Sequence, residues 1–570
     1  MLSGLEVRQR DVVGTVPEAP HLSPLLRRIV AARGINKAEK LSLSLADLPA
    51  FTLPDEAKAV SLLLQSLQQN EAIVIVGDYD ADGATATALL YRALTAFGFS
   101  RVSYFVPDRF VYGYGLSPAI VRAVHEQGPV DLIITVDNGI TSVEGVALAQ
   151  AQGVKVLVTD HHLPGTQLPT AEALVNPRLE PHRPGQHLAG VGVVFYLLAA
   201  LRRELRAQGH PGGEVNISQW LDLVAVGTVA DVVRLDHINR ILVEQGLRRI
   251  RSGNTLPGIK ALLTVAGREP QQLCAQDLGF VVAPRLNAAG RLSDMAQGIR
   301  CLLADSEAQA REDAEALDAI NRQRRHIEQG MREEALAQVE RWQQQQLPAV
   351  ACLYESHWHE GVVGIVAARV REAIHRPVFA FAPAQQAGLV KGSGRSIKGL
   401  HLKDLLERVA ALRPGLLQAF GGHAMAAGVT LPKTALSEFS HALQVAMAEV
   451  ATEALFQPII ETDGELQENE INLALAEEVR FAFPWGTGFE PPTFDGEFEV
   501  LNHRVVGEKH LKLTLGLPRR SGVVDAIYFN PPEAYLSGGF HRIYGVYRLE
   551  VNEWQNRRNV QLLFEYLQPR

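Results

Sequence analysis

Short apolar runs alternate with amphipathic stretches between about residues 70 and 235. The apolar runs predict strands at Ala72–Val76, Val102–Val106, Leu132–Val136, Val154–Val158 and Leu223–Ala230. The stretches between them predict helices at Thr85–Phe97, Pro118–Glu126 and Ser142–Gln152. This alternation is typical of an open α/β sheet, in which ligands collect at the carboxyl ends of parallel strands.

The second half of the chain predicts a long helix and two further domains. Residues 306–346 are polar, rich in Ala, Glu, Gln and Arg, and free of Pro, which favours a connecting helix. A second α/β segment follows, with Gly-rich loops at 391–396 and 421–428. Its expected elements are a strand at Ala349–Tyr354, a helix at Val362–Ile374 and a strand at Val378–Ala382.

Beyond about residue 456 the pattern changes to short β-like runs, such as Leu511–Leu515 and Gln561–Tyr566. About five short strands indicate an OB-like barrel, a fold that commonly binds single strands. The expected domains are an N-terminal segment at 1–50, a first α/β domain at 51–300, a connecting helix at 301–346, a second α/β domain at 347–455 and a barrel at 456–570.

Three aspartates follow the first predicted strand, at Asp78, Asp80 and Asp82. Carboxylates this close repel one another unless a cation holds them, and oxygen ligands favour Mg²⁺, Mn²⁺ or Ca²⁺. An EF-hand loop begins with the same spacing, but its twelfth position requires Glu and here is Leu89. A solvated turn is the other alternative, because Asp and Gly favour turns.

Further ligand-type residues follow the other apolar runs. They are Asp137, the triplet Asp160-His161-His162, and Asp231. Because the carboxyl ends of parallel strands share one edge of a sheet, these side chains are expected to meet. Two divalent cations would offset the charge of four carboxylates and could clamp a phosphodiester during an in-line displacement.

Composition limits the class of protein. The 570 residues are 47% hydrophobic and 21% charged with a net charge of −8, so any contact with DNA is expected within a local groove. The start of the chain lacks the apolar core of a signal peptide, and no run is long enough to span a membrane. Three widely spaced cysteines favour a reducing cytoplasm over a disulfide framework.

The motifs together resemble the DHH phosphoesterase family. The similar segments are Asp80-x-Asp82-Gly83, Asp137-Asn138-Gly139, Asp160-His161-His162 and Gly227-Thr228-Val229-Ala230-Asp231, and Gly421-Gly422-His423 with Ala426-Ala427-Gly428 resembles the associated DHHA1 domain. Four further segments are similar to the branch that degrades single-stranded DNA: Val106-Pro107-x-Arg109-Phe110, the run Gly113–Leu116, the run Pro284–Leu292 and the run Trp358–Ile365.

This resemblance implies two α/β domains, DHH with a parallel sheet and DHHA1, joined by a long helix and followed by an OB-like barrel. It implies a 5′→3′ exonuclease that degrades single-stranded DNA to mononucleotides in recombination, base-excision repair and mismatch repair. Two Mn²⁺ or Mg²⁺ ions would be the cofactors. The implied catalytic residues are Asp80, Asp82, Asp137, His161, His162 and Asp231.

The resemblance also assigns metal ligands. Asp80 would hold one ion, Asp82, His161 and Asp231 the other, and Asp137 would bridge them. Asp78 is a further candidate ligand, near the position of a histidine in many relatives. His162 would contact the scissile phosphate.

Several cations lie in Gly- or Pro-containing segments outside regular helix patterns, which suits a phosphate track. The predicted DNA or phosphate contacts are Arg109, Tyr114, Arg285, Asn287, Arg291, Lys391, Ser393, Arg395, Ser396 and His423. The resemblance places Arg109, Ser393 and Arg395 in a pocket for the 5′ phosphate, whereas Tyr114 could stack on a base. Asp108 stands where the family has Asn.

The implied partners are single-stranded DNA with a 5′ phosphate, a single-strand-binding protein, a RecQ-type helicase and mismatch-repair factors, and the chain is expected to be a monomer. Two alternatives remain. Another DHH enzyme, such as a nanoRNase or a cyclic-dinucleotide phosphodiesterase, would have a shorter chain. A non-catalytic DNA-binding scaffold would lose ligands, and the expected ligands are present here.

Overall fold

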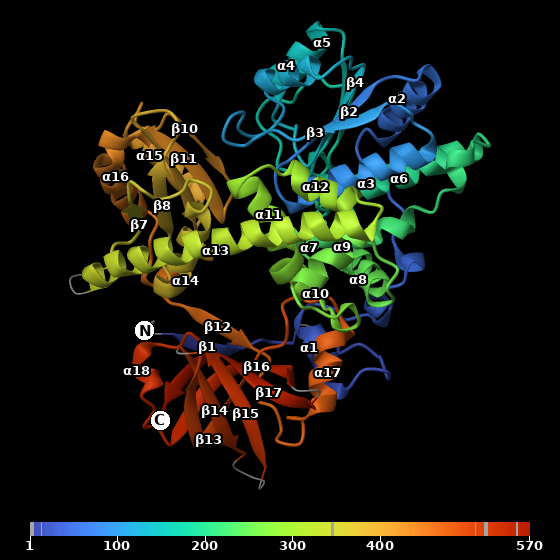
Figure 1. Ribbon diagram of the computed structural model, residues 1–570. Coiled ribbons are helices and arrows are strands. Elements are labelled where there is room, and N and C mark those ends of the chain that lie inside the picture. The colour runs from blue at the N-terminus through green and yellow to red at the C-terminus, as the bar shows by residue number, and fades with distance from the viewer. Residues whose placement is uncertain (1–4, 13, 344–346, 508, 518–521, 555–556) are drawn as a thin grey trace. The chain divides into compact units, whose positions relative to one another are not determined.

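The computed structural model (Figure 1) describes residues 5–12, 14–343, 347–507, 509–517, 522–554 and 557–570. It divides into two compact units. One comprises Met1–Gln9 and Asn321–Glu461, and the other comprises Arg10–Ile320 and Thr462–Arg570. In the described ranges, every helix is too short or too polar to cross a membrane.

The larger unit contains a five-stranded parallel sheet with the order β3-β2-β4-β5-β6. The strands are β2 (Ile73–Gly77), β3 (Val102–Phe105), β4 (Leu132–Val136), β5 (Lys155–Thr159) and β6 (Ala173–Val175). The connecting helices are α3 (Ala81–Phe97), α4 (Pro118–Glu126) and α5 (Val143–Ala151). The predicted parallel α/β sheet is therefore confirmed.

Both faces of this sheet are covered, which explains its continuous apolar strands. Ile73 and Ile75 point into the large core, whereas Val74 and Val76 point into a smaller core with α4 and α5. Further helices of the larger unit, besides short 3-10 turns, are α1 (Pro24–Ala32), α2 (Glu56–Gln69), α6 (Gly190–Ala207), α7 (Leu221–Ala230), α8 (His237–Arg251), α9 (Pro257–Val265), α10 (Ala275–Asp277), η7 (Leu278–Val282), α11 (Ala283–Leu292) and α12 (Ala296–Leu303).

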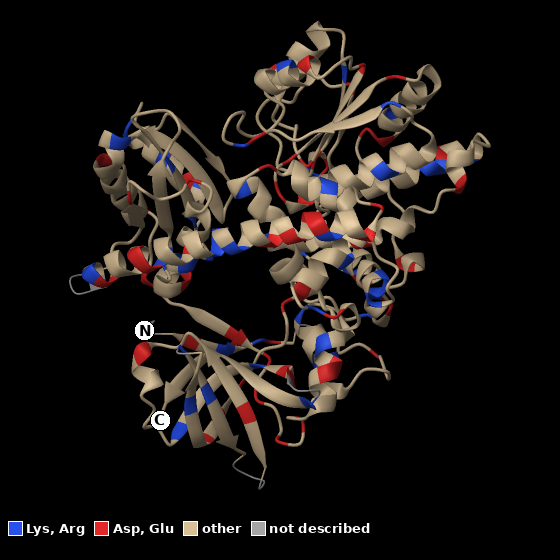
Figure 2. Ribbon diagram, in the orientation of Figure 1, with Lys and Arg blue, Asp and Glu red and all other residues tan. Residues whose placement is uncertain are grey.

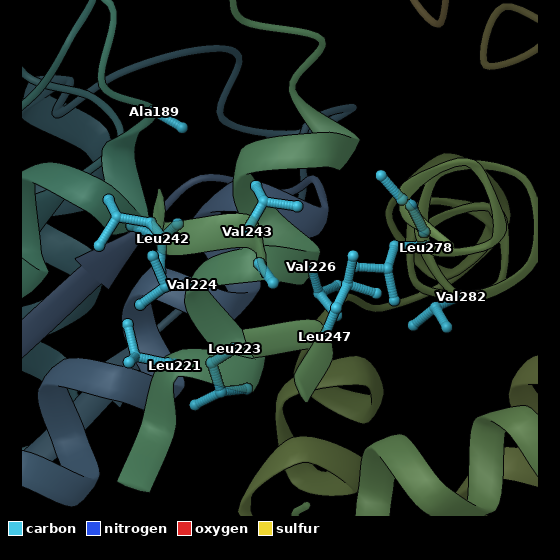
Figure 3. Close-up of a cluster of buried hydrophobic side chains, with 14 of the residues drawn as sticks. Ala189, Leu221, Leu223, Val224, Val226, Leu242, Val243, Leu247, Leu278 and Val282 are labelled. Atoms are coloured by element: carbon cyan, nitrogen blue, oxygen red, sulfur yellow. The ribbon is translucent and has the colours of Figure 1, made fainter. Parts of the chain in front are cut away.

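The predicted strand at Leu223–Ala230 is wrong, because this run lies within helix α7. Its side chains are buried from Leu223 to Thr228, and Figure 3 shows Leu221, Leu223, Val224 and Val226 beside Leu242 and other residues of α8. A helix that is apolar all round has no amphipathic period, so hydrophobicity alone could not distinguish it from a buried strand.

Helix α13 (Glu307–Gln343) belongs to both units, and the boundary between them falls within it. Figure 2 shows Lys, Arg, Asp and Glu distributed along its length. The long helix predicted at 306–346 is confirmed over this range, and residues 344–346 lie outside the described part of the chain.

The smaller unit has a five-stranded mixed sheet with the order β10-β11-β9-β8-β7. Its strands are β7 (Ala351–Tyr354), β8 (Val378–Pro383), β9 (Leu389–Arg395), β10 (Ala419–Gly422) and β11 (Ala426–Pro432). Its helices are α14 (Val363–Ile374), α15 (Leu402–Leu412) and α16 (Leu436–Ala448). A separate two-stranded sheet pairs β12 (Ile459–Thr462) with β1 (Glu6–Gln9). The predicted Gly-rich loops are thus mostly strands. Gly392 and Gly394 leave room for the rings of Phe381 and Phe379 on the adjacent strand.

The C-terminal strands form a closed barrel with the order β13-β14-β15-β17-β16, which confirms the OB-like expectation. The strands are β13 (Phe494–Val506), β14 (His510–Gly516), β15 (Val523–Phe529), β16 (Arg542–Trp554) and β17 (Arg557–Pro569), with helix α17 (Leu473–Ala482) before them and α18 (Glu533–Leu536) between β15 and β16. Phe494, Phe498, Tyr547 and Phe564 are buried inside.

An ion pair links the start of the chain to the segment leading into the barrel. Asp463 accepts hydrogen bonds from Arg33 Nη1 at 2.8 Å, from Arg33 Nη2 at 2.9 Å and from the amide of Thr493 at 3.0 Å. Both side chains of the pair are only 2% exposed. The Arg33 guanidinium also lies 5.4 Å from the ring centroid of Trp485.

Replacing Asp463 with Ala should destabilise the larger unit by about 3 kcal/mol, because the substitution leaves the Arg33 charge buried and unpaired. Chemical denaturation followed by circular dichroism measures the loss. The matched control is Glu214→Ala, which removes an exposed ion pair with Arg206 and should leave the transition unchanged. Equal midpoints for Asp463→Ala and the control would contradict this role.

Candidate metal centre

The three aspartates lie where strand β2 turns into helix α3. Asp80 is the N-cap of α3, and its Oδ1 accepts hydrogen bonds from the amides of Asp82 and Gly83, both at 3.0 Å. Asp82 is only 1% exposed, and Leu89 is buried within α3. The segment is therefore neither an EF-hand loop nor a solvated turn.

The Asp82 carboxylate is held by the N-terminus of a second helix, α6. Its Oδ2 accepts from the amide of Gly190 at 2.6 Å, and its Oδ1 accepts from the amide of Val191 at 2.9 Å. Free amides and the helix dipole at this end stabilise negative charge. A Cβ at Gly227 of α7 would lie 2.8 Å from Asp82 Oδ1, so glycine permits the close approach of that helix.

Asp137 and His161 occupy the middle of the site. Asp137 follows β4 with a φ of 62°, and its Oδ1 lies 3.0 Å from His161 Nε2. The same nitrogen is 3.5 Å from Asp231 Oδ2 and 4.0 Å from Asp82 Oδ2. Asp231 is the C-cap of α7, so the predicted residue reaches the site from a helix end and not from a strand end.

Asp160 orients the second histidine. Its Oδ1 accepts from the amides of His161 at 2.7 Å and His162 at 3.1 Å, and it lies 2.7 Å from His162 Nδ1. Burial lowers the pKa of His162, but the hydrogen bond and charge of Asp160 outweigh burial and raise this pKa to about 9. Asp160 and the nearby carboxylates therefore favour the protonated form of His162 in the metal-free protein.

The carboxylates around His161 strongly perturb one another. Burial, followed by the charge of Asp80, raises the pKa of Asp82 to about 7. Burial and neighbouring carboxylates also raise the pKa values of Asp78, Asp137 and Asp231 well above the ordinary range. A cation bound among them would relieve this repulsion.

Three trios of donor atoms could each hold an ion, with the atoms of a trio within 4.8 Å of one another. The trios are Asp78 with Asp80 and Asp137, Asp82 with His161 and Asp231, and Asp137 with His161 and His162. Asp137 Oδ1 is buried and accepts no hydrogen bond from the described residues. Carboxylate and imidazole donors around such an atom fit Mn²⁺ or Mg²⁺.

Two predicted contact residues border the centre. The Arg109 guanidinium lies 4.5 Å from the ring centroid of Tyr79, and its charge lowers the pKa of Asp78 against the larger effect of burial. The Tyr114 hydroxyl lies 3.0 Å from His162 Nδ1, although the residue as a whole is 44% exposed. Asp108 Oδ1 accepts from the amide of Phe110 at 2.8 Å, so this aspartate caps its own turn.

Arg285, Asn287 and Arg291 lie on the regular helix α11, which corrects the expectation that the two arginines lie outside regular helices. Arg285 is 7% exposed and pairs with Asp318 of α13 at 2.8 Å. Asn287 Oδ1 accepts from the amide of Ala81 at 2.8 Å, so it supports the start of α3. The pattern of the sequence did not indicate these two structural contacts.

The remaining predicted contacts belong to the smaller unit. Arg395 Nη1 donates to Ser393 Oγ at 3.0 Å on β9, and Lys391 pairs with Glu360 at 3.1 Å. Ser396 is fully buried and donates to the carbonyl of Leu400 at 2.8 Å. His423 is exposed in the turn between β10 and β11.

Gly364, in the first turn of α14, lies directly against the Ser393 and Arg395 side chains. A Cβ at this position would lie 2.9 Å from both Ser393 Oγ and Arg395 Nη2. Burial, followed by the charge of Arg371, lowers the pKa of Arg395. The Arg395 guanidinium and the Ser393 hydroxyl beside the first turn of α14 form a suitable surface for an anion.

Three family models match this chain. The DHH family, N-terminal domain, matches residues 72–228, the DHHA1 domain matches 347–449, and the RecJ OB domain matches 462–566. Together with the carboxylate–histidine centre, these matches define a DHH–DHHA1 protein with a C-terminal OB domain.

Relatives narrow this class further. The single-stranded-DNA-specific exonuclease RecJ of Escherichia coli (strain K12) is 46% identical and covers 100% of both chains. The chain belongs to the RecJ family. The structure of RecJ with Mn²⁺ from Thermus thermophilus is similar, with a TM-score of 0.82, 28% identity and coverage of 100% of this chain and 80% of that one. The Mg²⁺ complex gives a TM-score of 0.75, with 27% identity and coverage of 100% and 79%.

The raised pKa values predict how metal binding and pH affect stability. Asp82 has a pKa of about 7 in the folded protein and about 4 when unfolded, so its favourable contribution is lost as the pH rises through about 7. We expect Mn²⁺ to raise the melting temperature more at pH 8 than at pH 5.5, because the ion binds ionised carboxylates. Scanning fluorimetry with and without Mn²⁺ tests this expectation.

The matched variant for this measurement is Asp231→Asn. It should raise the melting temperature of the metal-free protein at pH 8, since one repelling charge is removed, and should reduce the increase produced by Mn²⁺. An equal response to Mn²⁺ at both pH values would contradict the electrostatic account.

Proposed function

We propose that the protein is a metal-dependent exonuclease that degrades single-stranded DNA from the 5′ end to mononucleotides in recombination and repair. The proposal rests on the three trios of metal-ligand atoms, each of which includes the buried residue Asp137 or His161. RecJ relatives named as single-stranded-DNA-specific exonucleases support the substrate. The three cysteines are free thiols, which suits a reducing cytoplasm.

Two ions would be divided between two trios that are bridged by Asp137. Asp78 and Asp80 would hold one ion with Asp137, and Asp82, His161 and Asp231 would hold the other. Bound Mn²⁺ or Mg²⁺ would supply a hydroxide nucleophile near neutral pH and offset the charge of the phosphodiester.

His162 would act on the reacting phosphate through its positive charge. The contact between Nδ1 and Asp160 at 2.7 Å favours the protonated imidazole and fixes the orientation of the ring. A cation held in place next to the phosphate stabilises charge that develops on its oxygens. Tyr114 limits the movement of the same ring through its hydroxyl contact at 3.0 Å.

The 5′ phosphate would bind at Ser393, Arg395 and the first turn of α14. A hydroxyl, a guanidinium and the amides of a helix N-terminus are donors that recognise a terminal phosphate. Anchoring this end would define the polarity of degradation, because the strand would be held by its 5′ end.

The barrel offers a second DNA surface. Phe529 and Val523 of β15 and Val505 of β13 are exposed apolar residues, and His510 packs edge-on against Phe529 with ring centroids 4.9 Å apart. OB barrels bind single strands by stacking bases on such side chains. Partner proteins in repair remain a prediction from the family resemblance.

Single-stranded DNA labelled at either end tests the proposed activity and polarity. With Mn²⁺, we expect the 5′ label to be released first as a mononucleotide, whereas blunt duplex should remain intact. Asp82→Asn should reduce the rate at least about 100-fold, because a ligand is lost. The control Asp305→Asn, at a carboxylate 89% exposed, should retain activity. Release of the 3′ label first would refute the polarity.

A comparison of 5′-phosphorylated with 5′-hydroxyl DNA tests the proposed binding site for the 5′ phosphate. Arg395→Ala should raise KM for 5′-phosphorylated DNA about 10- to 100-fold, because a charge-assisted hydrogen bond is lost, and should leave KM for 5′-hydroxyl DNA unchanged. The control Arg408→Ala removes an exposed cation of α15 that pairs with Glu449. Equal losses on both substrates would show that Arg395 has only a structural role.

A further inference from the structure

Phe280 is exposed over 73% of its surface, the largest fraction among the exposed large apolar residues of the described chain. It lies in η7, a π-helical segment that continues into α11. Its neighbours Leu278 and Val282 point into the core beside Val226 and Leu247 (Figure 3). The segment is therefore firmly packed on one side, and the Phe280 ring extends from the other.

The position of η7 gives this exposure a functional meaning, because a single exposed apolar residue is otherwise common. A Cβ added to Gly279 would lie 3.2 Å from Val229 Cγ1, and Val229 precedes the candidate ligand Asp231 by two residues. The segment that carries Phe280 therefore packs against the end of α7 that contributes to the metal centre.

The helix that follows reaches the other side of the centre. Asn287 binds the amide of Ala81, and Gly290 approaches the carbonyl of Tyr79 so closely that a Cβ would overlap it. Gly290 comes ten positions after Phe280 along this helix, which corresponds to about 15 Å. The η7–α11 segment thus borders the metal centre, with Phe280 near one end.

A second exposed apolar residue directly follows a candidate ligand. Val232 directly follows Asp231, is 65% exposed and has a φ of 61°, which is strained for a β-branched residue. Two exposed apolar side chains therefore lie on segments that pack together beside the site. A hydrated phosphate backbone would gain little from them, whereas the faces of unpaired bases would.

We propose that Phe280 stacks on an unpaired base of the DNA strand that occupies the metal centre. This inference rests on the proposed exonuclease function and adds a base contact to it. Stacking on an aromatic ring accepts any base, which suits degradation without sequence preference. In a duplex the base faces are covered by their neighbours, so the contact also favours single strands.

The test measures KM and kcat for single-stranded oligonucleotides, each with one abasic site at a different position. For wild type, an abasic site at one particular position should raise KM about 5- to 100-fold, the range for the loss of one stacked base. Phe280→Ala should raise KM similarly on intact DNA, and the abasic site should then have no further effect. Phe280→Trp should retain the wild-type KM.

Val445→Ala, at a residue 40% exposed on α16, is the matched control and should behave as wild type. Equal KM values for wild type on all abasic substrates would overturn the proposal. An increase in KM from Phe280→Ala that is the same on intact and on abasic DNA would also overturn it. Dissociation constants measured in EDTA separate this proposal from the proposed function, since they report stacking even if no DNA is cut.

Discussion

Mutual repulsion among five carboxylates is the constraint on which the larger unit depends. Asp78, Asp80, Asp82, Asp137 and Asp231 meet in a largely buried volume, and four of them have raised pKa values. Such a cluster opposes folding unless the surrounding structure supplies positive potential. The fold meets this requirement with helix N-termini and with His162, whose pKa is raised, and bound cations would complete it.

The backbone makes this arrangement possible as much as the side chains do. Helices α3 and α6 direct their amide ends at Asp80 and Asp82, so two helix dipoles converge on the first pair of carboxylates. Gly190 lets α6 approach the loop after β4, since a Cβ at Gly190 would lie 2.7 Å from Asp137 Cβ. Gly227 likewise lets α7 approach the Asp82 carboxylate. Close packing at these glycines fixes the donor positions before any ion or substrate arrives.

The sequence predicted the sheet and most of the centre, because short apolar runs that end in carboxylates have few other interpretations. It failed at α7, whose apolar residues are buried on all sides and show no period. It also failed for Arg285 and Asn287, whose partners are 33 and 206 residues away in the chain. Such contacts depend on tertiary structure, and no local pattern encodes them.

The division of the chain into units has a consequence for biosynthesis. The unit that carries the metal centre is discontinuous, since it combines Arg10–Ile320 with Thr462–Arg570. The intervening segment is continuous and can complete its own sheet while the ribosome is still translating. The larger unit instead gains its second segment only when Thr462–Arg570 emerges, and Asp463 can then meet Arg33. Synthesis of the last part of the chain therefore sets the earliest moment at which this unit is complete.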